Sequence, residues 1–283
     1  AFPNPEEPGA TDLLLALAAE TDAEVAIALD PDADRCAVGI PTAQGWRLLS
    51  GNETGWLLGD YLLSNLTPDE AQKTVVASSL VSSQLLATIA ADHGAHHVET
   101  LTGFKWLARA DQDIPGATLR YAYEEAIGHC VDPDAVRDKD GISAAVVFCD
   151  LVVALRNQGQ TVQDLLDALA AKYGVHLTGA VSVHTDADAV MARLRAEPPA
   201  QIAGIAVSVE DLDRLRGPRR TDALIFTGEG LRVAVRPSGT EPKVKCYIEV
   251  SKQPAADVSA SGAAAESELR EIEAAVTGLL APA

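Results

Sequence analysis

The chain has 283 residues, of which 47% are hydrophobic and 22% are charged, and its formal net charge is -19. This length and composition suit two or three globular domains, and the acidity argues against nucleic acid or an anionic membrane as a partner. No apolar stretch reaches the roughly 18 residues of a membrane-spanning helix, so none is expected. The cysteines are far apart, which favours reduced thiols and a cytoplasmic location; they are Cys36, Cys130, Cys149 and Cys246.

The first part of the chain alternates between strand-like and helix-like segments. Helices are expected over residues 12–20, 53–65, 82–94, 141–159 and 161–174. Strands are expected over residues 25–29, 34–41, 46–51, 74–78 and 118–123, with a short one near Val98. Such alternation predicts α/β layers with largely parallel strand pairing to about residue 175.

After that point the pattern changes to closely spaced strands. They are expected over residues 179–185, 204–211, 222–228, 231–239 and 244–252, with one helix near 187–196. A last helix over about 265–280 follows a stretch rich in Ala, Ser and Pro (251–266), which we expect to be flexible. The predicted fold class is therefore α/β, with mixed α/β sheet domains followed by a C-terminal α+β domain that has an antiparallel sheet.

The motif "DPDADR" places Asp30, Asp32 and Asp34 on alternate residues at the end of an apolar strand, with Arg35 directly behind them. In an extended segment these side chains would project to the same side. Three negative charges so close together repel one another unless a positive charge lies among them. Carboxylate oxygens at this spacing suit a hard divalent cation, either Mg²⁺ or Ca²⁺.

The acidic motif is also compatible with features that are not a magnesium loop. Asp-Pro-Asp is a good solvated turn. An EF-hand loop starting at Asp30 would need Gly and Glu where the chain has Arg35 and Pro41, so that loop is excluded. A phosphatase loop of the haloacid-dehalogenase type normally has Thr or Val where this chain has Asp34, which weakens that alternative without excluding it.

The motif "VRPSGTEPK" joins two predicted strands through a loop that contains Arg236, Ser238, Gly239 and Thr240. Gly permits close backbone approach, the hydroxyls can donate hydrogen bonds, and Arg can bind a phosphate with two parallel bonds. Lys245 lies nearby on the next strand, where the residues on either side of it would face the core. The alternative is an ordinary hairpin turn.

Two further motifs, "TGFKWLARA" and "YEEAIGHC", lie between these loops. Gly103 and Lys105 stand where a helix is expected to start, and amide groups at a helix start favour anions or polar ligands. Glu124 and Glu125 follow a strand, where paired acids can accept hydrogen bonds from sugar hydroxyls. His129 by itself would more simply be a structural histidine.

The three loops, in this order, resemble those of the α-D-phosphohexomutase family, which includes phosphomannomutases and phosphoglucomutases. "DPDADR" is similar to the family's Asp-x-Asp-x-Asp-Arg magnesium loop, "EEAIGH" to its sugar-binding loop and "RPSGTEPK" to its phosphate-binding loop. "AFPNPEEPG" is typical of the segment upstream of the metal loop. The resemblance covers nearly the entire chain.

The resemblance implies a role for each matching residue. Asp30, Asp32 and Asp34 would hold Mg²⁺, Arg35 would support the reacting phosphate, and His129 would contact the substrate or assist proton transfer. The sugar would be bound by Glu125 with Lys105 nearby, and the phosphate that does not react by Arg236, Ser238, Gly239 and Thr240. Ile127 stands where the family often has a sugar-contacting serine, and "YEEAIGH" looks closer to the phosphoglucomutase and phosphopentomutase branch.

Members of that family have four domains and react through a phosphoserine on the first, in a Thr-x-Ser-His-Asn-Pro type motif. That motif is absent from this sequence, and "SSLVSS" at residues 78–83 is better explained as a strand-to-helix turn. The resemblance therefore implies a fragment without the nucleophile. Residues 1–51 would be the end of the second domain, 52–176 the third domain and 177–283 the fourth.

The implied activity is that of a phosphosugar mutase, an isomerase that acts as an intramolecular phosphotransferase in carbohydrate metabolism. It would interconvert the 1-phosphate and 6-phosphate of mannose or glucose through a phosphoserine and a hexose bisphosphate intermediate. Two alternatives remain open. A Mg²⁺-dependent sugar phosphatase would release inorganic phosphate, whereas a non-catalytic phosphosugar-binding module would explain every loop and the missing serine.

Overall fold

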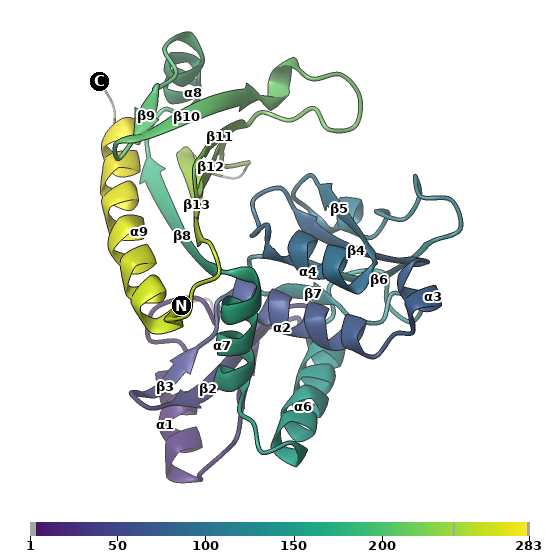
Figure 1. Ribbon diagram of the computed structural model, residues 1–283. Coiled ribbons are helices and arrows are strands. Elements are labelled where there is room, and N and C mark those ends of the chain that lie inside the picture. The colour runs from purple at the N-terminus through teal and green to yellow at the C-terminus, as the bar shows by residue number, and fades with distance from the viewer. Residues whose placement is uncertain (1–3, 240, 282–283) are drawn as a thin grey trace. The chain divides into compact units, whose positions relative to one another are not determined.

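The computed structural model describes residues 4–239 and 241–281. They form two compact units, one that runs to Leu169 and one that starts at Ala170 (Figure 1). The chain passes from one unit to the other within helix α7 (Val162–Tyr173).

The first unit opens with an antiparallel sheet rather than a parallel one. Its strands lie in the order β1 (Ala26–Leu29), β2 (Cys36–Thr42) and β3 (Gly45–Leu48), after helix α1 (Asp12–Glu20). Leu29 pairs with Cys36, so the acidic motif forms the connection of a β-hairpin. The prediction of largely parallel pairing is therefore wrong for this part of the chain, because short connections bring consecutive strands back antiparallel.

The second sheet of this unit has the predicted α/β character. Its strand order is β5-β4-β6-β7, in which β4 pairs in parallel with β5 and β6, and β7 is antiparallel to β6. These strands are β4 (Thr74–Ser79), β5 (His96–Thr100), β6 (Thr118–Glu124) and β7 (Gly128–Cys130). The remaining helices are α2 (Gly51–Ser64), α3 (Pro68–Ala71), α4 (Leu85–His93), α5 (Phe104–Leu107) and α6 (Gly141–Asn157).

Helices lie close against both faces of this sheet. Glycines on α2 permit the approach on one face, since a Cβ atom on Gly55 would lie 2.6 Å from the ring of Tyr123 on β6, and one on Gly59 would lie 3.4 Å from the ring of Tyr121 on the same strand. On the other face, Phe104 of α5 packs in a cluster with Val75, Ala77 and Leu119, among others. The sheet is therefore covered on both sides, as parallel sheets require.

Two helices of this unit start next to the loops that carry the candidate site. Helix α2 begins with a capping box, in which Ser50 accepts from the backbone N–H of Glu53 and the Glu53 side chain accepts from the N–H of Ser50. Helix α6 is capped by Asp140, which accepts from the N–H groups of Ile142 and Ser143. These caps fix where Gly51 and Gly141, the first residues of the two helices, lie.

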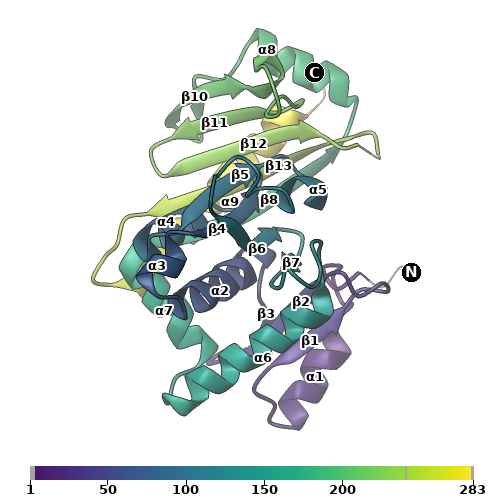
Figure 2. The ribbon, with the colours of Figure 1, turned by 90° about the vertical axis from the view of Figure 1, so that its right-hand side faces the viewer.

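The second unit is an antiparallel sheet with helices, as predicted. Its strand order is β8-β13-β12-β11-β10-β9, and Figure 2 shows β10, β11, β12 and β13 side by side. The strands are β8 (Val175–His184), β9 (Gln201–Ile202), β10 (Ile205–Asp211), β11 (Leu224–Gly228), β12 (Leu231–Pro237) and β13 (Lys243–Lys252). The helices are α8 (Ala187–Ala196) and α9 (Val258–Leu280), with a short 3₁₀ turn at Leu212–Arg214.

One face of this sheet forms the core with α8 and α9. Along β13, Val244, Cys246, Ile248 and Val250 are all buried, while Lys245 lies on the opposite face. This alternation confirms the expectation drawn from the sequence, because successive side chains of a strand point to opposite faces.

Helix α9 starts earlier than predicted. Residues from Val258 onward are helical, although the composition of the stretch 251–266 predicts flexibility. Asp257 caps the helix by accepting from the N–H of Ala260 at 2.9 Å, and the many alanines that follow are good helix formers. The sequence does not predict the short elements α3, β7 and β9, since two to four residues carry no periodic signal.

Among the described residues, no single helix has the length and apolar character needed to cross a membrane. Only α6 and α7 taken as a pair, with a bend of 86° between them, meet the length and composition requirement.

The core of the second unit generates a test of the fold. Phe226 on β11 has 0% of its surface exposed within the cluster that joins the sheet to α8 and α9. We expect Phe226→Ala to lower the free energy of unfolding by about 3–5 kcal/mol, because it leaves a cavity in a packed core. Chemical denaturation followed by circular dichroism would measure this loss.

The matched control is Val209→Ala on the neighbouring strand β10, since Val209 is 41% exposed. It should change the free energy of unfolding by about 0.5 kcal/mol or less. Equal losses in the two variants would contradict the described packing.

Candidate functional site

The acidic motif forms a cluster in a turn. Each of Asp30, Asp32 and Asp34 offers one carboxylate oxygen, and these atoms lie within 4.8 Å of one another. The residues between β1 and β2 form a turn in which Ala33 has a φ of 58°. The prediction of a cluster is therefore confirmed, but the reason given for it, alternation along an extended segment, is wrong.

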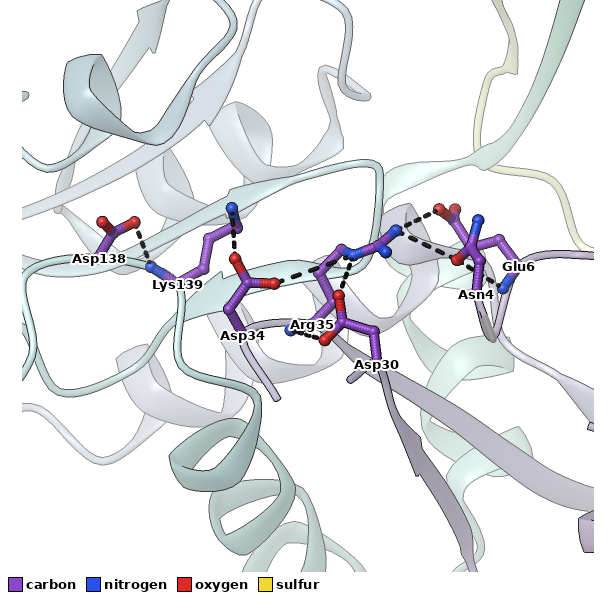
Figure 3. A network of polar contacts seen from close by, with 7 residues as sticks. All are labelled: Asn4, Glu6, Asp30, Asp34, Arg35, Asp138 and Lys139. Atoms are coloured by element: carbon purple, nitrogen blue, oxygen red, sulfur yellow. Dashed lines mark hydrogen bonds and ion pairs between the residues drawn. The ribbon is translucent and has the colours of Figure 1, made fainter. Parts of the chain in front are cut away.

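Arg35 binds the buried member of the cluster with both its backbone and its side chain (Figure 3). Its N–H donates to Oδ1 of Asp30 at 3.1 Å, and its Nε donates to Oδ2 at 2.7 Å. On the other side, Nη1 of Arg35 contacts Oδ1 of Asn4 at 3.2 Å and Oε2 of Glu6 at 3.5 Å. Burial alone would raise the pKa of the Asp30 carboxyl, but these bonds from Arg35 and its charge hold that pKa below its usual value.

Lys139 supplies a second positive charge that sequence reasoning missed. Its Nζ lies 2.9 Å from Oδ2 of Asp34 (Figure 3). Burial lowers the pKa of Lys139, but the hydrogen bond and charge of Asp34 outweigh this and raise it. The available signal was the lysine flanked by two aspartates in "RDKDG", directly before a predicted helix.

The donor set of this turn fits a divalent cation. Three carboxylates from one turn give hard oxygen ligands, which Mg²⁺ and Ca²⁺ prefer. Asp30 is buried, Asp34 is half-buried and Asp32 is exposed, so the cluster has one side that solvent reaches. The two neighbouring cations, Arg35 and Lys139, bring positive charge close enough to assist an anionic ligand beside the metal.

The backbone joins this turn to the predicted sugar loop. The N–H of Cys36 donates to the carbonyl oxygen of Ile127 at 2.9 Å, and Arg35 forms an antiparallel bridge with Gly128. Ile127 has a φ of 54°, which is unusual for a β-branched residue. Its side chain is 2% exposed, so burial and this hydrogen bond hold the strained conformation in place.

The two acids of the sugar loop have separate hydrogen-bond partners. Oε1 of Glu124 accepts from the N–H of Gly103 at 2.6 Å. Oε2 of Glu125 lies 3.0 and 3.2 Å from the hydroxyl oxygens of Ser79 and Ser82, within hydrogen-bonding distance of both. Burial raises the pKa of Glu125, and the charge of Glu124 raises it further.

His129 lies in a different setting from the one expected. It has 0% of its surface exposed, and its ring stacks with those of Tyr121 and Tyr123. Its Nδ1 lies 3.0 Å from the Tyr121 hydroxyl, and burial lowers its pKa to about 3. A neutral, enclosed imidazole cannot reach a substrate from solvent, so this geometry does not support direct contact or proton transfer by His129.

Lys105 lies on α5, close in sequence to the Gly103 amide that binds Glu124. Its side chain is exposed, and Nζ lies 5.4 Å from the centre of the Trp106 ring. The sugar loop and the "GFK" loop are thus connected through Glu124, as the resemblance implied that they would be neighbours.

The predicted phosphate loop lies in the second unit, between β12 and β13. Arg236 stands directly opposite Lys245 across these two strands. The N–H of Ser238 donates to the carbonyl oxygen of Lys243 at 2.8 Å, and Gly239 is exposed. Thr240 lies outside the described residues. Like charges opposite each other destabilise a sheet unless an anion lies near both.

Three family models match the chain. They are described as phosphoglucomutase/phosphomannomutase alpha/beta/alpha domain II, over residues 1–43, alpha/beta/alpha domain III, over residues 50–173, and the C-terminal domain, over residues 162–264. Together they cover most of the sequence in the order that the motifs predicted.

Curated relatives and solved structures give the same result. A "Probable phosphomannomutase" from Haemophilus influenzae is 45% identical over 254 residues, which cover 88% of this chain and 50% of that protein. A phosphopentomutase from Pongo abelii is 38% identical over 285 residues, covering 89% of this chain and 46% of that protein. The chain therefore spans about half the length of these relatives.

The fold is similar to a crystal structure of a phosphoglucomutase/phosphomannomutase family protein from Burkholderia thailandensis. The TM-score is 0.62 at 18% sequence identity, and the match covers 98% of this chain and 52% of that one. At this identity the likeness concerns the fold alone.

The acidic turn can be tested by metal binding without any assay of activity. We expect Asp32→Asn to weaken Mg²⁺ binding by roughly 10- to 100-fold, since it removes the charge of one of the three clustered carboxylates. Isothermal titration calorimetry of the two proteins would measure the change. Asp134→Asn, which alters an exposed acid outside the cluster, should bind as the wild type does. Unchanged binding in Asp32→Asn would show that the metal lies elsewhere.

Proposed function

The chain belongs to the α-D-phosphohexomutase family of phosphoglucomutases and phosphomannomutases, and from that premise we propose that it forms part of a phosphosugar mutase. The proposed reaction interconverts sugar 1-phosphates and sugar 6-phosphates, with glucose or mannose as the sugar. The observation that carries the proposal is the backbone link between two loops of different chemistry. A three-carboxylate turn and a loop with paired glutamates are joined at Arg35 and Gly128.

In this proposal, Asp30, Asp32 and Asp34 hold Mg²⁺. When bound, the metal supplies Lewis-acid neutralisation of charge on the transferred phosphoryl group. Arg35 and Lys139 add positive charge beside the same turn, and Arg35 is oriented by its bonds to Asp30 and Asn4. These bonds hold the guanidinium group of Arg35 in one orientation. A fixed orientation lowers the entropic cost of binding the reacting phosphate in the geometry that transfer requires.

The sugar is proposed to bind at Glu125, with Lys105 nearby. Glu125 has its Oε2 bound to serine hydroxyls, and a carboxylate can accept hydrogen bonds from sugar hydroxyls at its other oxygen. His129 is assigned a positioning role, since its buried ring packs beside the rings of Tyr121 and Tyr123. It is therefore left out of the proton-transfer steps.

The phosphate that does not react is proposed to bind to Arg236, Ser238, Gly239 and Thr240. The support is the position of two cations on facing strands, Arg236 and Lys245, which places positive charge of both side chains beside this loop. Gly239 carries no side chain that would obstruct the approach of phosphate oxygens to the backbone.

The proposed reaction runs through a phosphoserine and a bisphosphate. The serine's phosphoryl group passes to the free hydroxyl of the sugar phosphate, which gives a sugar bisphosphate and a free serine. After the bisphosphate turns over, its other phosphate returns to the serine, and the sugar hydroxyl is restored. The matching models are those of domains II, III and the C-terminal domain, so the serine is proposed to lie outside these 283 residues.

A pentose phosphate is the alternative substrate, and an assay with both kinds of sugar phosphate would distinguish the two. The relative from Pongo abelii is named a phosphopentomutase, and for a pentose substrate the second phosphate position would be carbon 5. A cytoplasmic location is part of the same proposal. All four cysteines are free thiols, as expected of a reducing compartment.

The phosphate loop gives a binding test. Arg236→Ala should weaken sugar-phosphate binding by roughly 2–3 kcal/mol, the range for a charge-assisted hydrogen bond. Binding of unphosphorylated sugar should change far less, and calorimetry with both ligands would separate the two. Arg214→Ala, an exposed arginine of the same unit that pairs with Asp211, is the control. Equal losses for both ligands would mean that Arg236 shapes the loop and does not bind phosphate.

The reaction itself is tested by a coupled mutase assay on the protein at its natural full length. Hexose and pentose 1-phosphates are offered separately, with Mg²⁺ and a catalytic amount of the sugar bisphosphate. We expect isomerised sugar phosphate to form and Asp32→Asn to reduce its rate at least 100-fold, roughly the effect of losing one electrostatic contact in the transition state. Release of inorganic phosphate in place of isomerisation would identify a phosphatase, and binding without turnover would identify a non-catalytic module.

A further inference from the structure

Two buried serines hold Glu125 from the end of strand β4. Ser79 and Ser82 are 0% and 2% exposed, and both hydroxyls contact Oε2 of Glu125, at 3.0 and 3.2 Å. The two hydroxyl oxygens lie 2.8 Å apart, and the hydroxyl of Ser82 also accepts from the N–H of Glu125 at 3.1 Å. Neither serine belongs to the metal, sugar or phosphate motifs described above.

The number of protons decides how these contacts are made. Each hydroxyl has one proton to donate, so two hydroxyls cannot fill three oxygen–oxygen contacts when Glu125 is ionised. The shorter distances select one order: Ser82 donates to Ser79 at 2.8 Å, and Ser79 donates to Oε2 at 3.0 Å. The N–H of Glu125 donates to Ser82 and closes a ring that starts and ends at Glu125.

Such a ring fixes the carboxylate more firmly than a single bond would, since hydrogen bonds in a chain polarise one another. The ring also gives Glu125 hydrogen-bond partners that differ from those of the adjacent acid, Glu124. The neighbouring Glu124 is held by a different donor, the N–H of Gly103. Both serine hydroxyls contact Oε2 of Glu125 and not Oε1.

We propose that Ser79 and Ser82 are positioning residues that anchor Oε2 of Glu125 and so present Oε1 to a hydroxyl of the sugar. This rests on the proposed function, in which Glu125 binds the sugar. A glutamate without the ring would be free to rotate about its side-chain bonds, and part of the binding free energy would then be lost in ordering it.

The ring has a consequence for pH. Burial and the charge of Glu124 raise the pKa of Glu125, whereas its contacts with the hydroxyl groups of Ser79 and Ser82 lower it. A carboxylate accepts a hydrogen bond from a sugar hydroxyl more strongly when it is ionised, so sugar binding weakens as the pH falls through the pKa of Glu125. Removal of a serine hydroxyl raises that pKa further, so the acid limb of sugar binding moves to higher pH.

The test compares Ser79→Ala and Ser82→Ala with the control Ser78→Ala. Ser78 is also buried at the end of β4, but its hydroxyl contacts His97 at 2.9 Å and not Glu125. Binding of glucose 1,6-bisphosphate in the presence of Mg²⁺ is measured by calorimetry over a range of pH, with inorganic phosphate as a second probe. The unfolding midpoint of each variant is measured alongside.

Each of Ser79→Ala and Ser82→Ala should weaken bisphosphate binding about tenfold, the effect of one net hydrogen bond, and should shift the acid limb upward. Inorganic phosphate should bind as before, and Ser78→Ala should match the wild type. An unshifted acid limb, or an equal loss in Ser78→Ala, would overturn the positioning role.

Glu125→Gln distinguishes the proposed role of Glu125 in sugar binding from the positioning role of Ser79 and Ser82. If Glu125→Gln binds the bisphosphate as the wild type does, or if the wild type does not bind it, the proposed role of the sugar loop is wrong. If Glu125→Gln weakens binding but Ser79→Ala and Ser82→Ala do not, the sugar loop stands and the positioning role is wrong.

Discussion

Repulsion among the carboxylates of the Asp30–Asp34 turn is the constraint on which the rest of the site depends. At 4.8 Å or less, each pair of ionised carboxylates repels by roughly 3 kcal/mol at the effective dielectric of a protein surface. Two cations offset this in the described structure. Arg35, at the end of the same turn, donates hydrogen bonds to both carboxylate oxygens of Asp30. Lys139, in the loop before α6, forms an ion pair with Asp34.

The need to bring Lys139 to this turn explains much of the surrounding backbone. Helix α6 starts two residues after the lysine, and the N–H of its first residue, Gly141, donates to the carbonyl oxygen of Ala33 at 3.0 Å. A Cβ atom on Gly141 would lie 2.6 Å from the carbonyl oxygen of Arg35, so only glycine permits this approach. On the sugar side, a Cβ atom on Gly51 would lie 1.9 Å from the carbonyl oxygen of Glu125. Both helix starts thus hold a loop of the site by direct backbone contact.

The sequence predicts features that depend on neighbouring residues, but it does not predict contacts that arise only when distant segments fold together. The acidic spacing predicts the cluster, and the alternation along β13 predicts which residues face the core. The turn conformation of Ala33 is not predictable in this way, since a left-handed residue other than Gly or Asn leaves little sequence signal. Lys139 cannot be paired with Asp34 from the sequence because the two residues lie in distant segments that only the fold brings together.

At His129 the motif and the described geometry point to different roles. Its place in "EEAIGH" marks it as a site residue, but pairing with Tyr123 in the β6–β7 register directs it into the interior. The sequence does not mark Ser79 and Ser82 as site residues, because "SSLVSS" has the composition of a turn between a strand and a helix. That description is correct, and the same turn supplies the hydroxyls that bind Glu125. Hydroxyl residues at the carboxyl end of a parallel strand are therefore candidates for a role in ligand binding even where no motif marks them.

The most direct test of the central claim is a crystal structure of the protein with Mn²⁺ and a sugar 1,6-bisphosphate. An anomalous difference map would locate the metal. The claim is that the acidic turn and the Glu125 loop form one ligand site. It predicts an anomalous peak among the carboxylates of Asp30, Asp32 and Asp34, and sugar density within hydrogen-bonding distance of Glu125. A metal peak away from the turn, or a sugar bound away from Glu125 with the turn still closed by Arg35 and Lys139, would contradict it.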